Sequence, residues 1–421
     1  MIDSEEATTS EIERLLPNEI ILYIFSFIPP KELVSKVTLV CHKFNKLLEN
    51  REYWKGKIKS RQNVHLADCE LKHSDFDARK SYVAIYEQKE RWNNWENQTL
   101  KTAFGHSATV DSVVLFNKNS KRFCLSGSRD RSIRLWDIEN IERNEDIDGN
   151  RWTIGINDNA HQGWIWNIAK DRENDDVFYT TSWDSTVKSW EITESTIREK
   201  QNVRVGSAAQ CVSCLPETNE IVCTTFAKRV AVIDKRSFAI SGEYNVHKRA
   251  VIALAVQGNI IYTSGEDRLL VMVDRRNMSK PILLNYCPNA YKSYLSIHNN
   301  QLLTATSDGN VSIFSAQKLS ILNTYKVGIF TRQVIIYRGA HLVMAKQNRG
   351  FKFSVHTPGI RSSPICESSE LATEPAKFDY LPSSRTLAIG NGDSSIVFCL
   401  PRGSEEQEEE IEVQESQENN V

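Results

Sequence analysis

The amino-acid sequence predicts an all-β propeller of seven blades that follows a small all-α module and a helical linker. Residues 126–137, SGSRDRSIRLWD, combine a tight turn with an alternating strand that ends in Trp-Asp. When segments of this shape are aligned on the turn residue Asp130, six further copies follow at intervals of 40 to 54 residues, at Asp184, Ala227, Asp267, Asp308, Asn348 and Asp393. A period of roughly 40–45 residues is typical of four-stranded propeller blades. Seven copies therefore predict seven blades.

A histidine stands upstream of the turn in three copies, as His106, His161 and His247. In a propeller blade such a histidine can bond the turn aspartate and a hydroxyl, and so hold the inner turns together. Together with the Trp-Asp endings, these residues resemble the WD-repeat family, most closely in the first two copies. The resemblance implies a seven-bladed WD-repeat propeller over residues 97–401. Because His106, His161 and Asp130 recur once per blade, we assign them to structure and not to a catalytic triad.

Closure of the propeller needs one more strand. The last copy ends at residues 395–401, SIVFCLP, and no strand follows it before the acidic tail. Residues 98–102, QTLKT, precede His106 and have no blade of their own. Because an open ring would leave two sheet edges exposed, we expect residues 98–102 to supply the outer strand of the seventh blade.

The composition bounds the class of protein and its partners. The 421 residues are 40% hydrophobic and 25% charged, as in globular proteins. Residues 402–421 contain eight Glu and one Arg and predict a disordered tail with a net charge of −7, which leaves about +5 of the total −2 for the rest. The net positive charge of this remaining part is too small to predict nucleic-acid binding.

Cysteine usage and hydropathy predict a soluble chain of the cytoplasm, the nucleus or both. The nine cysteines are scattered along the chain, and their number is odd. Both features suit a reducing compartment better than a disulfide framework. Cys211 and Cys214 have zinc-like spacing, but no second pair or His follows, so strand core is the better interpretation. The first residues are acidic and polar, unlike a signal peptide, and no apolar run approaches ~20 residues.

The N-terminal region predicts a polar disordered segment, residues 1–12, and then three short helices. Ile20, Ile24, Phe27 and Ile28 share one helical face, and the double proline 29–30 ends this helix and opens the next. The apolar residues of the second helix are Leu33, Val37 and Val40, and those of the third are Phe44, Leu47 and Leu48, with Trp54 after it. This core is small, and apolar side chains remain on more than one face, so we expect a partner.

Residues 13–58 resemble the F-box through Leu16-Pro17-x-Glu19-Ile20, Ile24-x-x-Phe27-Ile28-Pro29, Leu33, Val40-Cys41-x-x-Phe44 and Trp54. Phe44 stands where Trp is commoner in that family. The resemblance implies docking on a SKP-type adaptor that hangs from a cullin scaffold. The residues it implies for adaptor binding are Leu15, Leu16, Pro17, Ile20, Ile24, Phe27, Ile28, Pro29, Leu33 and Val40. The alternative is a helical cap that packs on the propeller and binds nothing else.

Residues 59–96 predict a linker. Phe76, Tyr82, Val83, Ile85 and Tyr86 fit a helix with an aromatic face that continues towards Trp92 and Trp95. No Gly or Pro interrupts it, so we expect a stiff helical spacer. The alternative is a packing element that seals the F-box to the propeller, and both can hold.

The mouth of the central channel is the predicted binding site. In propellers it is lined by the residue before each turn aspartate and by residues that open the innermost strands. Counting along the copies predicts an aromatic arc of Trp166, Trp183 and Phe226 and a basic arc of Lys292, Arg332 and Lys377, with Arg129 beside it. Exposed aromatics with arginine are typical of binding hot spots. The alternative is an ordinary surface that binds nothing.

Relatives among the F-box/WD-repeat proteins bind phosphorylated degrons with arginines at these places. Arg129 matches one such position, whereas Asp111, Trp166 and Ile252 depart from the pattern. A doubly charged phosphate needs several convergent cationic donors. We therefore expect an acidic or mixed aromatic-acidic peptide rather than a strict phosphodegron.

The resemblance to F-box/WD-repeat proteins covers nearly the whole chain and implies the substrate receptor of a cullin–RING ubiquitin ligase. Such a receptor holds its substrate near a separate conjugating enzyme and contains no catalytic residue. No catalytic motif occurs in the sequence together with the surrounding pattern that it requires, and the resemblance implies no metal or cofactor. The rival hypothesis is a WD-repeat scaffold whose helical module binds a partner unrelated to ubiquitin. Nucleic-acid binding through the basic arc is a poorer third hypothesis.

Overall fold

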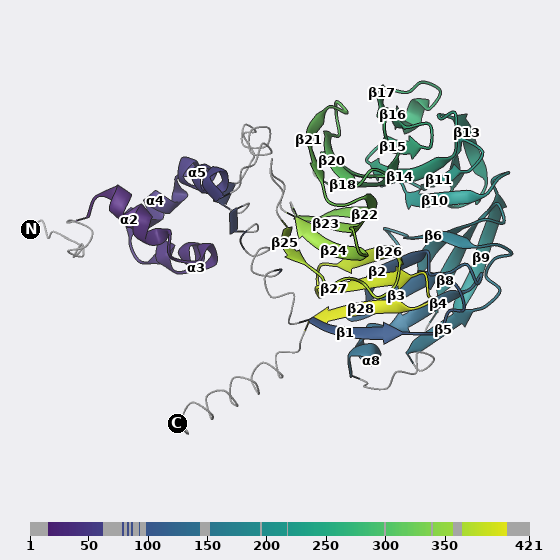
Figure 1. Ribbon diagram of the computed structural model, residues 1–421, viewed down its shortest axis with the longest axis horizontal. Coiled ribbons are helices and arrows are strands. Elements are labelled where there is room, and N and C mark those ends of the chain that lie inside the picture. The colour runs from purple at the N-terminus through teal and green to yellow at the C-terminus, as the bar shows by residue number, and fades with distance from the viewer. Residues whose placement is uncertain are drawn as a thin grey trace, which may run out of the picture.

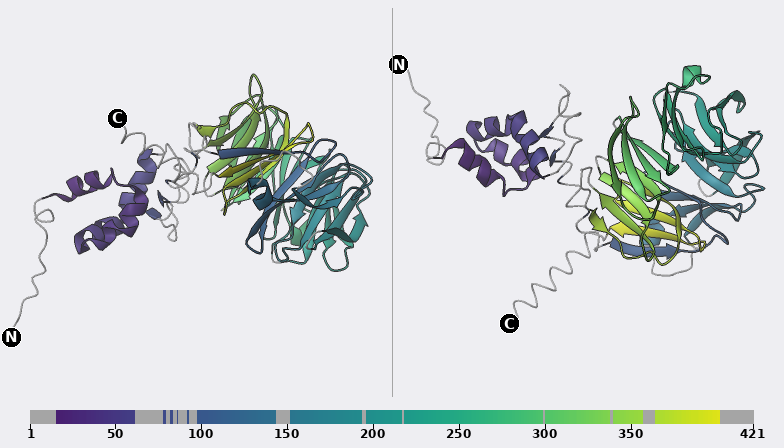
Figure 2. Two further views of the ribbon diagram at one scale, coloured as in Figure 1. Left: turned by 90° about the horizontal axis from the view of Figure 1, so that it is seen from below. Right: turned by 45° about the horizontal axis from the view of Figure 1, so that its top comes forward.

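The computed structural model describes residues 16–61, 78–79, 82–83, 86, 92, 98–143, 152–193, 196–216, 218–298, 300–337, 340–356 and 364–401. The predicted polar N-terminus, most of the linker and the acidic tail lie outside these residues. Figures 1 and 2 show a helical module and a propeller as the two parts of the structure. None of the described helices is both long and apolar enough to cross a membrane.

The helical module contains α2 (Asn18–Phe25), α3 (Pro30–Ser35), the 3-10 turn η1 (Val37–Leu39), α4 (His42–Glu49) and α5 (Arg51–Arg61). Pro30 occupies the first position of α3, where its missing N–H costs nothing. The Cys41 Sγ accepts the Phe44 N–H at 3.4 Å and begins α4. The second predicted helix is therefore shorter than expected, because the chain tightens into a 3-10 turn after Ser35.

The core of this module is formed by Ile21, Phe25, Leu33, Leu48, Trp54 and Ile58 together with the linker residues Ala78 and Tyr82. The Trp54 Nε1–H donates to the Leu48 carbonyl at 2.6 Å, which satisfies the polar atom of a buried ring. The Tyr82 and Trp54 ring centroids lie 5.7 Å apart. This part of the linker packs on the helices, as expected for a packing element.

The propeller consists of seven four-stranded antiparallel sheets, and each of the first six uses consecutive strands. Blades 1 to 3 contain β2 (Ser112–Lys118), β3 (Lys121–Gly127), β4 (Ile133–Asp137), β5 (Thr153–Asn157); β6 (Ile165–Lys170), β7 (Val177–Ser182), β8 (Thr186–Ile192), β9 (Ile197–Arg204); and β10 (Ala209–Cys214), β11 (Glu220–Thr225), β12 (Arg229–Asp234), β13 (Ile240–Asn245). Blades 4 to 6 contain β14 (Val251–Gln257), β15 (Ile260–Gly265), β16 (Leu269–Asp274), β17 (Leu283–Tyr286); β18 (Lys292–His298), β19 (Gln301–Thr306), β20 (Asn310–Ser315), β21 (Ile321–Lys326); and β22 (Phe330–Tyr337), β23 (Ala340–Lys346), β24 (Phe351–His356), β25 (Pro364–Glu367). Helix α8 (Ile138–Arg143) and the turn η4 (Arg275–Asn277) lie between strands.

Blade 7 closes the ring with strands from both ends of the propeller. It contains β26 (Pro375–Leu381), β27 (Thr386–Asn391), β28 (Ile396–Pro401) and the outer strand β1 (Gln98–Ala103). β1 pairs with β28 from Gln98 opposite Pro401 to Ala103 opposite Ile396, and Figure 1 shows the two strands side by side. The predicted closure is confirmed. It removes the edge that β28 would otherwise expose.

The hydrophobic core lies between neighbouring blades. Leu125 and Ile133 of blade 1, for example, belong to one cluster with Ile165 and Phe178 of blade 2. The buried linker residue Trp92 packs on blades 6 and 7, with its ring centroid 6.1 Å from Phe353 and 5.3 Å from Tyr380. The core of the helical module contains no propeller residue among those described. The linker thus contacts both parts, whereas the helices and the blades have separate cores.

Candidate functional site

The turns between the second and third strands of the blades lie on one face of the propeller, which we call the top face. The connections from each fourth strand to the next blade open on the same face, because strands alternate in direction. All seven residues aligned from the sequence lie in these turns. In six blades the following residue has a positive φ, between 64° and 82°, and these residues are Arg131, Ser185, Lys228, Arg268, Gly309 and Ser394. Six of the seven repeats therefore share one local geometry at this turn.

Three blades hold this turn through the predicted histidine. In blade 1 the His106 Nδ1 lies 2.9 Å from Asp130 Oδ2, and its Nε2 lies 2.7 Å from the Ser126 hydroxyl, which also accepts the Trp136 Nε1–H. Burial opposes ionisation of Asp130, but the bonds from His106 and Ser132 outweigh it and lower the pKa of this carboxyl. His161 with Asp184 and His247 with Asp267 repeat the arrangement at 2.9 and 3.0 Å. These residues are structural, as predicted.

The predicted aromatic arc forms a tryptophan cluster on the top face of blades 2 and 3, defined here as Trp164, Trp166, Trp183 and Phe226. Neighbouring ring centroids within it lie 5.7 to 6.1 Å apart. Trp164, Trp183 and Phe226 are 43%, 45% and 49% exposed. The Arg129 guanidinium lies 4.9 Å from the Trp164 ring centroid and 5.4 Å from that of Trp166, in cation–π contact. Large exposed aromatic groups of this kind mark an interaction surface.

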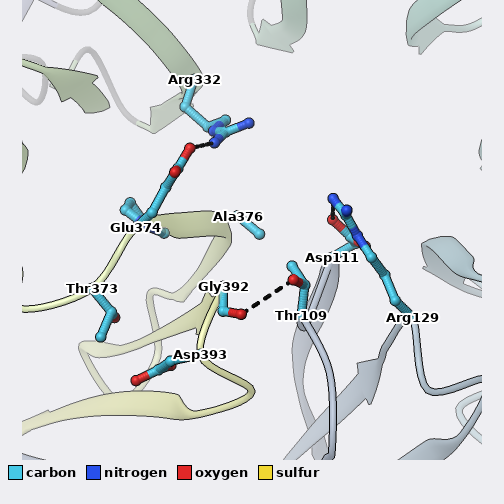
Figure 3. A pocket seen from close by; sticks show the side chains of 10 residues that line it. Thr109, Asp111, Arg129, Arg332, Thr373, Glu374, Ala376, Gly392 and Asp393 are labelled. Carbon is cyan, nitrogen blue, oxygen red and sulfur yellow. Dashed lines mark hydrogen bonds and ion pairs between the residues drawn. The ribbon is translucent and has the colours of Figure 1, made fainter.

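A cavity of about 700 Å³ opens where blades 1, 6 and 7 meet at the mouth (Figure 3). Arg129 donates from Nε to Asp111 Oδ2 at 2.7 Å and from Nη2 to Oδ1 at 3.2 Å. On the opposite wall the Arg332 guanidinium pairs with Glu374. Asp393 also lines the cavity. The two arginines are thus neutralised by carboxylates, and the mouth is not the basic arc that the sequence predicted.

The register of the innermost strands explains this difference. In six blades the N–H of the residue before the aligned turn residue bonds the carbonyl of a residue two positions before the mouth residue, as Trp183 does to Trp164 at 2.8 Å, Ser307 to Tyr291 at 3.0 Å and Gly392 to Glu374 at 2.7 Å. Counting two residues on reaches Trp166 in blade 2, but Ser293 in blade 5 and Ala376 in blade 7. The pairing shifts register at these three residues. The sequence-based count is therefore one residue out in blades 5 and 7.

Lys292 and Lys377 consequently do not line the mouth as predicted. One residue of displacement turns a strand side chain to the other face. Lys292 is 1% exposed, and its Nζ has no hydrogen-bond partner within the described ranges. Burial lowers the pKa of both lysines. Arg332 keeps the predicted register at the mouth.

The same register identifies mouth residues that the count missed. Trp164, Tyr291 and Glu374 are the carbonyl acceptors of these backbone bonds, and Trp164 belongs to the tryptophan cluster. The available signal was the triplet WIW at residues 164–166, in which two tryptophans share one side of a strand.

The helical module exposes an apolar helical face, defined here as Ile20, Tyr23 and Ile24 of α2 together with Phe27 in the turn that follows it. Their spacing of three and four places them on one side of the helix, and Phe27 is 72% exposed. The Tyr23 and Phe27 ring centroids lie 5.1 Å apart. Val40 and its neighbour Leu39 are also exposed, Leu39 by 82%. Sequence reasoning missed Tyr23 and Leu39, although Tyr23 has the spacing of the predicted face.

The other residues predicted to bind an adaptor lie in different environments. Pro17 and Pro29 are exposed, and Leu16 and Ile28 are half-buried against the module core. Leu33 is fully buried in that core, so it supports the helices from within and does not reach a partner in this conformation. Leu15 lies outside the described residues.

The described residues contain no group of side chains that could hold a metal ion. Cys214 is buried in a hydrophobic cluster, and the half-buried Cys211 thiol donates to the Ile252 carbonyl at 3.3 Å. Burial raises the pKa of both thiols, that of Cys214 to about 12, which disfavours the thiolate that zinc requires. None of the eight cysteines within the described ranges forms a disulfide with another of them.

Comparisons with known proteins agree with this architecture. Residues 14–57 match the model of the F-box-like family, and residues 97–137 match that of the WD domain, G-beta repeat. Over 72% of the chain the fold is similar to the crystal structure of the RRP9 WD40 repeats, with a TM-score of 0.62, 14% identity and 97% of that chain covered. That likeness concerns the fold alone.

Two curated relatives extend the similarity beyond single domains. The chain is 56% identical over 395 residues to the F-box/WD repeat-containing protein mec-15 of Caenorhabditis elegans, which covers 93% of this chain and 97% of that protein. It is 29% identical over 322 residues to the human F-box/WD repeat-containing protein 9, covering 74% and 67% of the two chains. In the sequence, the segments AHQGWIWN and SWDSTVKSW suggest a likeness to this ninth numbered member. The chain joins an F-box module to a WD-repeat propeller, and it matches mec-15 at 56% identity over 93% of its length. The chain therefore belongs to the F-box/WD repeat-containing proteins.

Proposed function

We propose that the chain is the substrate-recognition subunit of a cullin–RING, SCF-type ubiquitin ligase. In this proposal the helical module docks on a SKP-type adaptor that joins the chain to a cullin, and the mouth of the propeller binds the substrate protein. The chain itself performs no chemistry. It increases the rate of ubiquitin transfer by holding a substrate lysine near the conjugating enzyme.

The apolar helical face carries this proposal. Three large apolar side chains on one side of the eight-residue helix α2, and Phe27 in the turn after it, remain open to solvent, although burying each would contribute about 1.5–3 kcal/mol. A helix presents such a stripe when a partner covers it. An F-box is expected to use this face for its adaptor.

The rival scaffold hypothesis predicts a different environment for this face. If the helical module were a cap for the propeller, Ile24 and Phe27 would be buried against blades. Both side chains are exposed, and the core of the module consists of helix and linker residues only, within the described ranges. This favours a receptor whose adaptor-binding face is available.

The proposed complex works in the cytoplasm, the nucleus or both, where adaptor and cullin are found in this class of ligase. We also propose that the linker acts as a stiff spacer between adaptor and substrate. Two of its described contacts, that of Tyr82 with the helices and that of Trp92 with the propeller, support a fixed attachment at each end.

Co-purification tests the adaptor. The tagged full-length chain should bring down a SKP-type adaptor and a cullin, and Phe27→Glu should reduce adaptor recovery by more than about tenfold, because a charge would enter the apolar interface. Leu284→Glu is the matched control, since Leu284 is a 58% exposed apolar residue on the outer strand of blade 4. It should leave recovery unchanged. Equal recovery with Phe27→Glu, or no adaptor with the unmodified chain, would favour the scaffold hypothesis.

A further inference from the structure

The top face of blades 4 to 6 carries exposed cations without carboxylate partners. These are Lys248, Arg249, Arg268, Lys326, Lys346 and Arg349, and none forms an ion pair with a described residue. The exposed carboxylates on the same loops and strand ends are Glu266, Glu367, Glu370 and Glu374. Glu367 pairs with Lys352, and Glu374 pairs with Arg332. This sector therefore attracts anionic groups, in contrast to the neutralised mouth.

Two of these cations converge at a hollow between blades 5 and 6. Its volume is about 630 Å³, and Lys326, Arg349 and Lys352 line it together with Glu370 and the 56% exposed side chain of Ile329. Lys352 contacts Glu367 at 3.5 Å, whereas Lys326 and Arg349 remain available. The hollow combines free positive charge with an apolar wall.

The tryptophan cluster supplies an apolar anchor next to this sector. Phe226 and the exposed Lys228 belong to one turn of blade 3, and blade 4 with Arg249 and Arg268 follows. Arg129 already occupies a cation–π position over Trp164 and Trp166. A cationic ligand would compete with that guanidinium, whereas an aromatic or aliphatic side chain can pack on the exposed rings.

We infer that the top face binds a peptide segment in which an aromatic or aliphatic side chain lies close to several Asp or Glu residues. The anchor packs on the tryptophan cluster, and the carboxylates lie over the free cations of blades 4 to 6. The inference rests on the proposed function, because such a segment would belong to the substrate.

Carboxylates fit this face better than phosphates. A dianionic phosphate requires several donors on one point, but the free cations are distributed over loops of three blades, and both arginines of the mouth are held by Asp111 and Glu374. These two carboxylates and Asp393 at the cavity also repel the continuous phosphate backbone of a single-stranded nucleic acid.

Fluorescence anisotropy with the full-length chain tests the inference. The probe is a labelled synthetic peptide in which glutamates flank one phenylalanine. Matched probes replace the glutamates with glutamines or the phenylalanine with alanine, and each should bind at least about tenfold more weakly. Binding of the glutamate peptide should weaken with added salt, because exposed charges are screened.

Substitutions locate the binding site on the protein. Trp183→Ala should weaken binding of the glutamate peptide by about 30-fold, as at an aromatic hot spot. The double variant Lys326→Gln/Arg349→Gln should weaken it by about fivefold. Lys121→Gln/Arg385→Gln removes two exposed cations at the turns between first and second strands, on the opposite face, and should leave binding unchanged.

The outcomes separate this inference from the proposed function. The inference is overturned if the chain binds the glutamate and glutamine peptides with equal affinity. It is also overturned if the Trp183→Ala variant binds the glutamate peptide as tightly as the unmodified chain does. Tighter binding of a serine-phosphorylated glutamine peptide or of an oligouridylate overturns it as well. Tighter binding of the glutamate peptide after removal of residues 402–421 supports the inference. It would mean that in the intact chain the acidic tail competes with the peptide for the same cations. Adaptor recovery measured on the same preparation tests the receptor role independently, since no peptide result depends on Phe27.

Discussion

Blades 2 and 5 have the same fold but hold their inner turns in different ways. In blade 2 the His161 ring joins the turn residue Asp184 to Thr180, and the Trp190 Nε1–H donates to the same threonine hydroxyl at 2.8 Å. Blade 5 has no such histidine, and Asp308 bonds only Thr306 and Asn310 of its own turn. The network is therefore one way of holding the turn, and packing between blades suffices for the fold.

The difference also changes the top face. Blade 2 fixes its turn and its preceding loop with buried side chains and presents the tryptophan cluster. Blade 5 keeps only the backbone bond from Ser307 to Tyr291, which blade 2 also makes between Trp183 and Trp164, and it uses Gly309, whose φ of 82° and contact with Gly328 exclude a side chain. Blade 5 lies within the sector of free cations formed by blades 4 to 6. Blades can thus vary in surface chemistry without losing their common geometry.

The largest expected difference between the two blades concerns the turn aspartates. Asp184→Ala should lower the free energy of unfolding by about 3 kcal/mol, because His161, Thr186 and the Gln162 N–H would lose a buried acceptor. Asp308→Ala removes only local bonds and should cost about 1 kcal/mol. Denaturant unfolding of both variants measures the values. Equal losses would show that the histidine network adds nothing to its blade.

A smaller loss is expected when the tryptophan of the network is replaced. Blade 5 carries Phe314 at the position of Trp190. Trp190→Phe keeps an aromatic ring near Phe178, whose centroid lies 6.2 Å away, but removes the N–H donor to Thr180, and should cost about 1.5 kcal/mol. Unfolding curves for Trp190→Phe and the control Phe314→Leu provide the comparison. A change below the experimental error for Trp190→Phe would mean that the ring alone holds the blade.

The histidine networks should make stability depend on pH. Burial lowers the pKa of His106, His161 and His247 despite their aspartate partners, so the unfolded chain binds more protons below about pH 6.5, and stability falls as the pH falls. The lowered pKa values of Asp130, Asp184 and Asp267 extend the loss to lower pH. Asp379 acts in the opposite direction, because burial raises its pKa to about 6, but it is one group against several.

Thermal unfolding between pH 8 and pH 5 measures this dependence. The melting temperature should decrease on acidification, and His161→Gln should reduce the slope while lowering stability overall. A melting temperature that rises between pH 7 and pH 6 would contradict the assigned direction of the histidine pKa shifts.

The smallest effect is expected from the free cations of blades 4 to 6. Their mutual repulsion should make the chain slightly more stable in added salt, by less than about 1 kcal/mol, since exposed charges are screened within about 10 Å. Arg349→Gln should reduce this gain. A loss of stability in salt would indicate that these cations have favourable partners in solution.

Local periodicity in the amino-acid sequence was enough to predict several parts of the fold. Seven turn segments at a regular spacing predicted seven blades, and residues 98–102 without a blade predicted the closing strand. The apolar periodicity of residues 18–28 likewise predicted a helix with an uncovered side. These features follow from side-chain spacing along one element, which the order of residues contains directly.

Strand pairing and packing between blades set which side chains reach the mouth and what charge they bring. The pairing of the innermost strands in blades 5 and 7 places Ser293 and Ala376 at the mouth in place of Lys292 and Lys377, because the side chain of the next residue along a strand lies on the other side. The ion pair of Arg332 with Glu374 joins different blades, so no spacing along the chain could reveal it. Burial of Leu33 depends in the same way on how separate helices pack. The sequence thus determines where the blades and helices are, and contacts between them determine what the surfaces can bind.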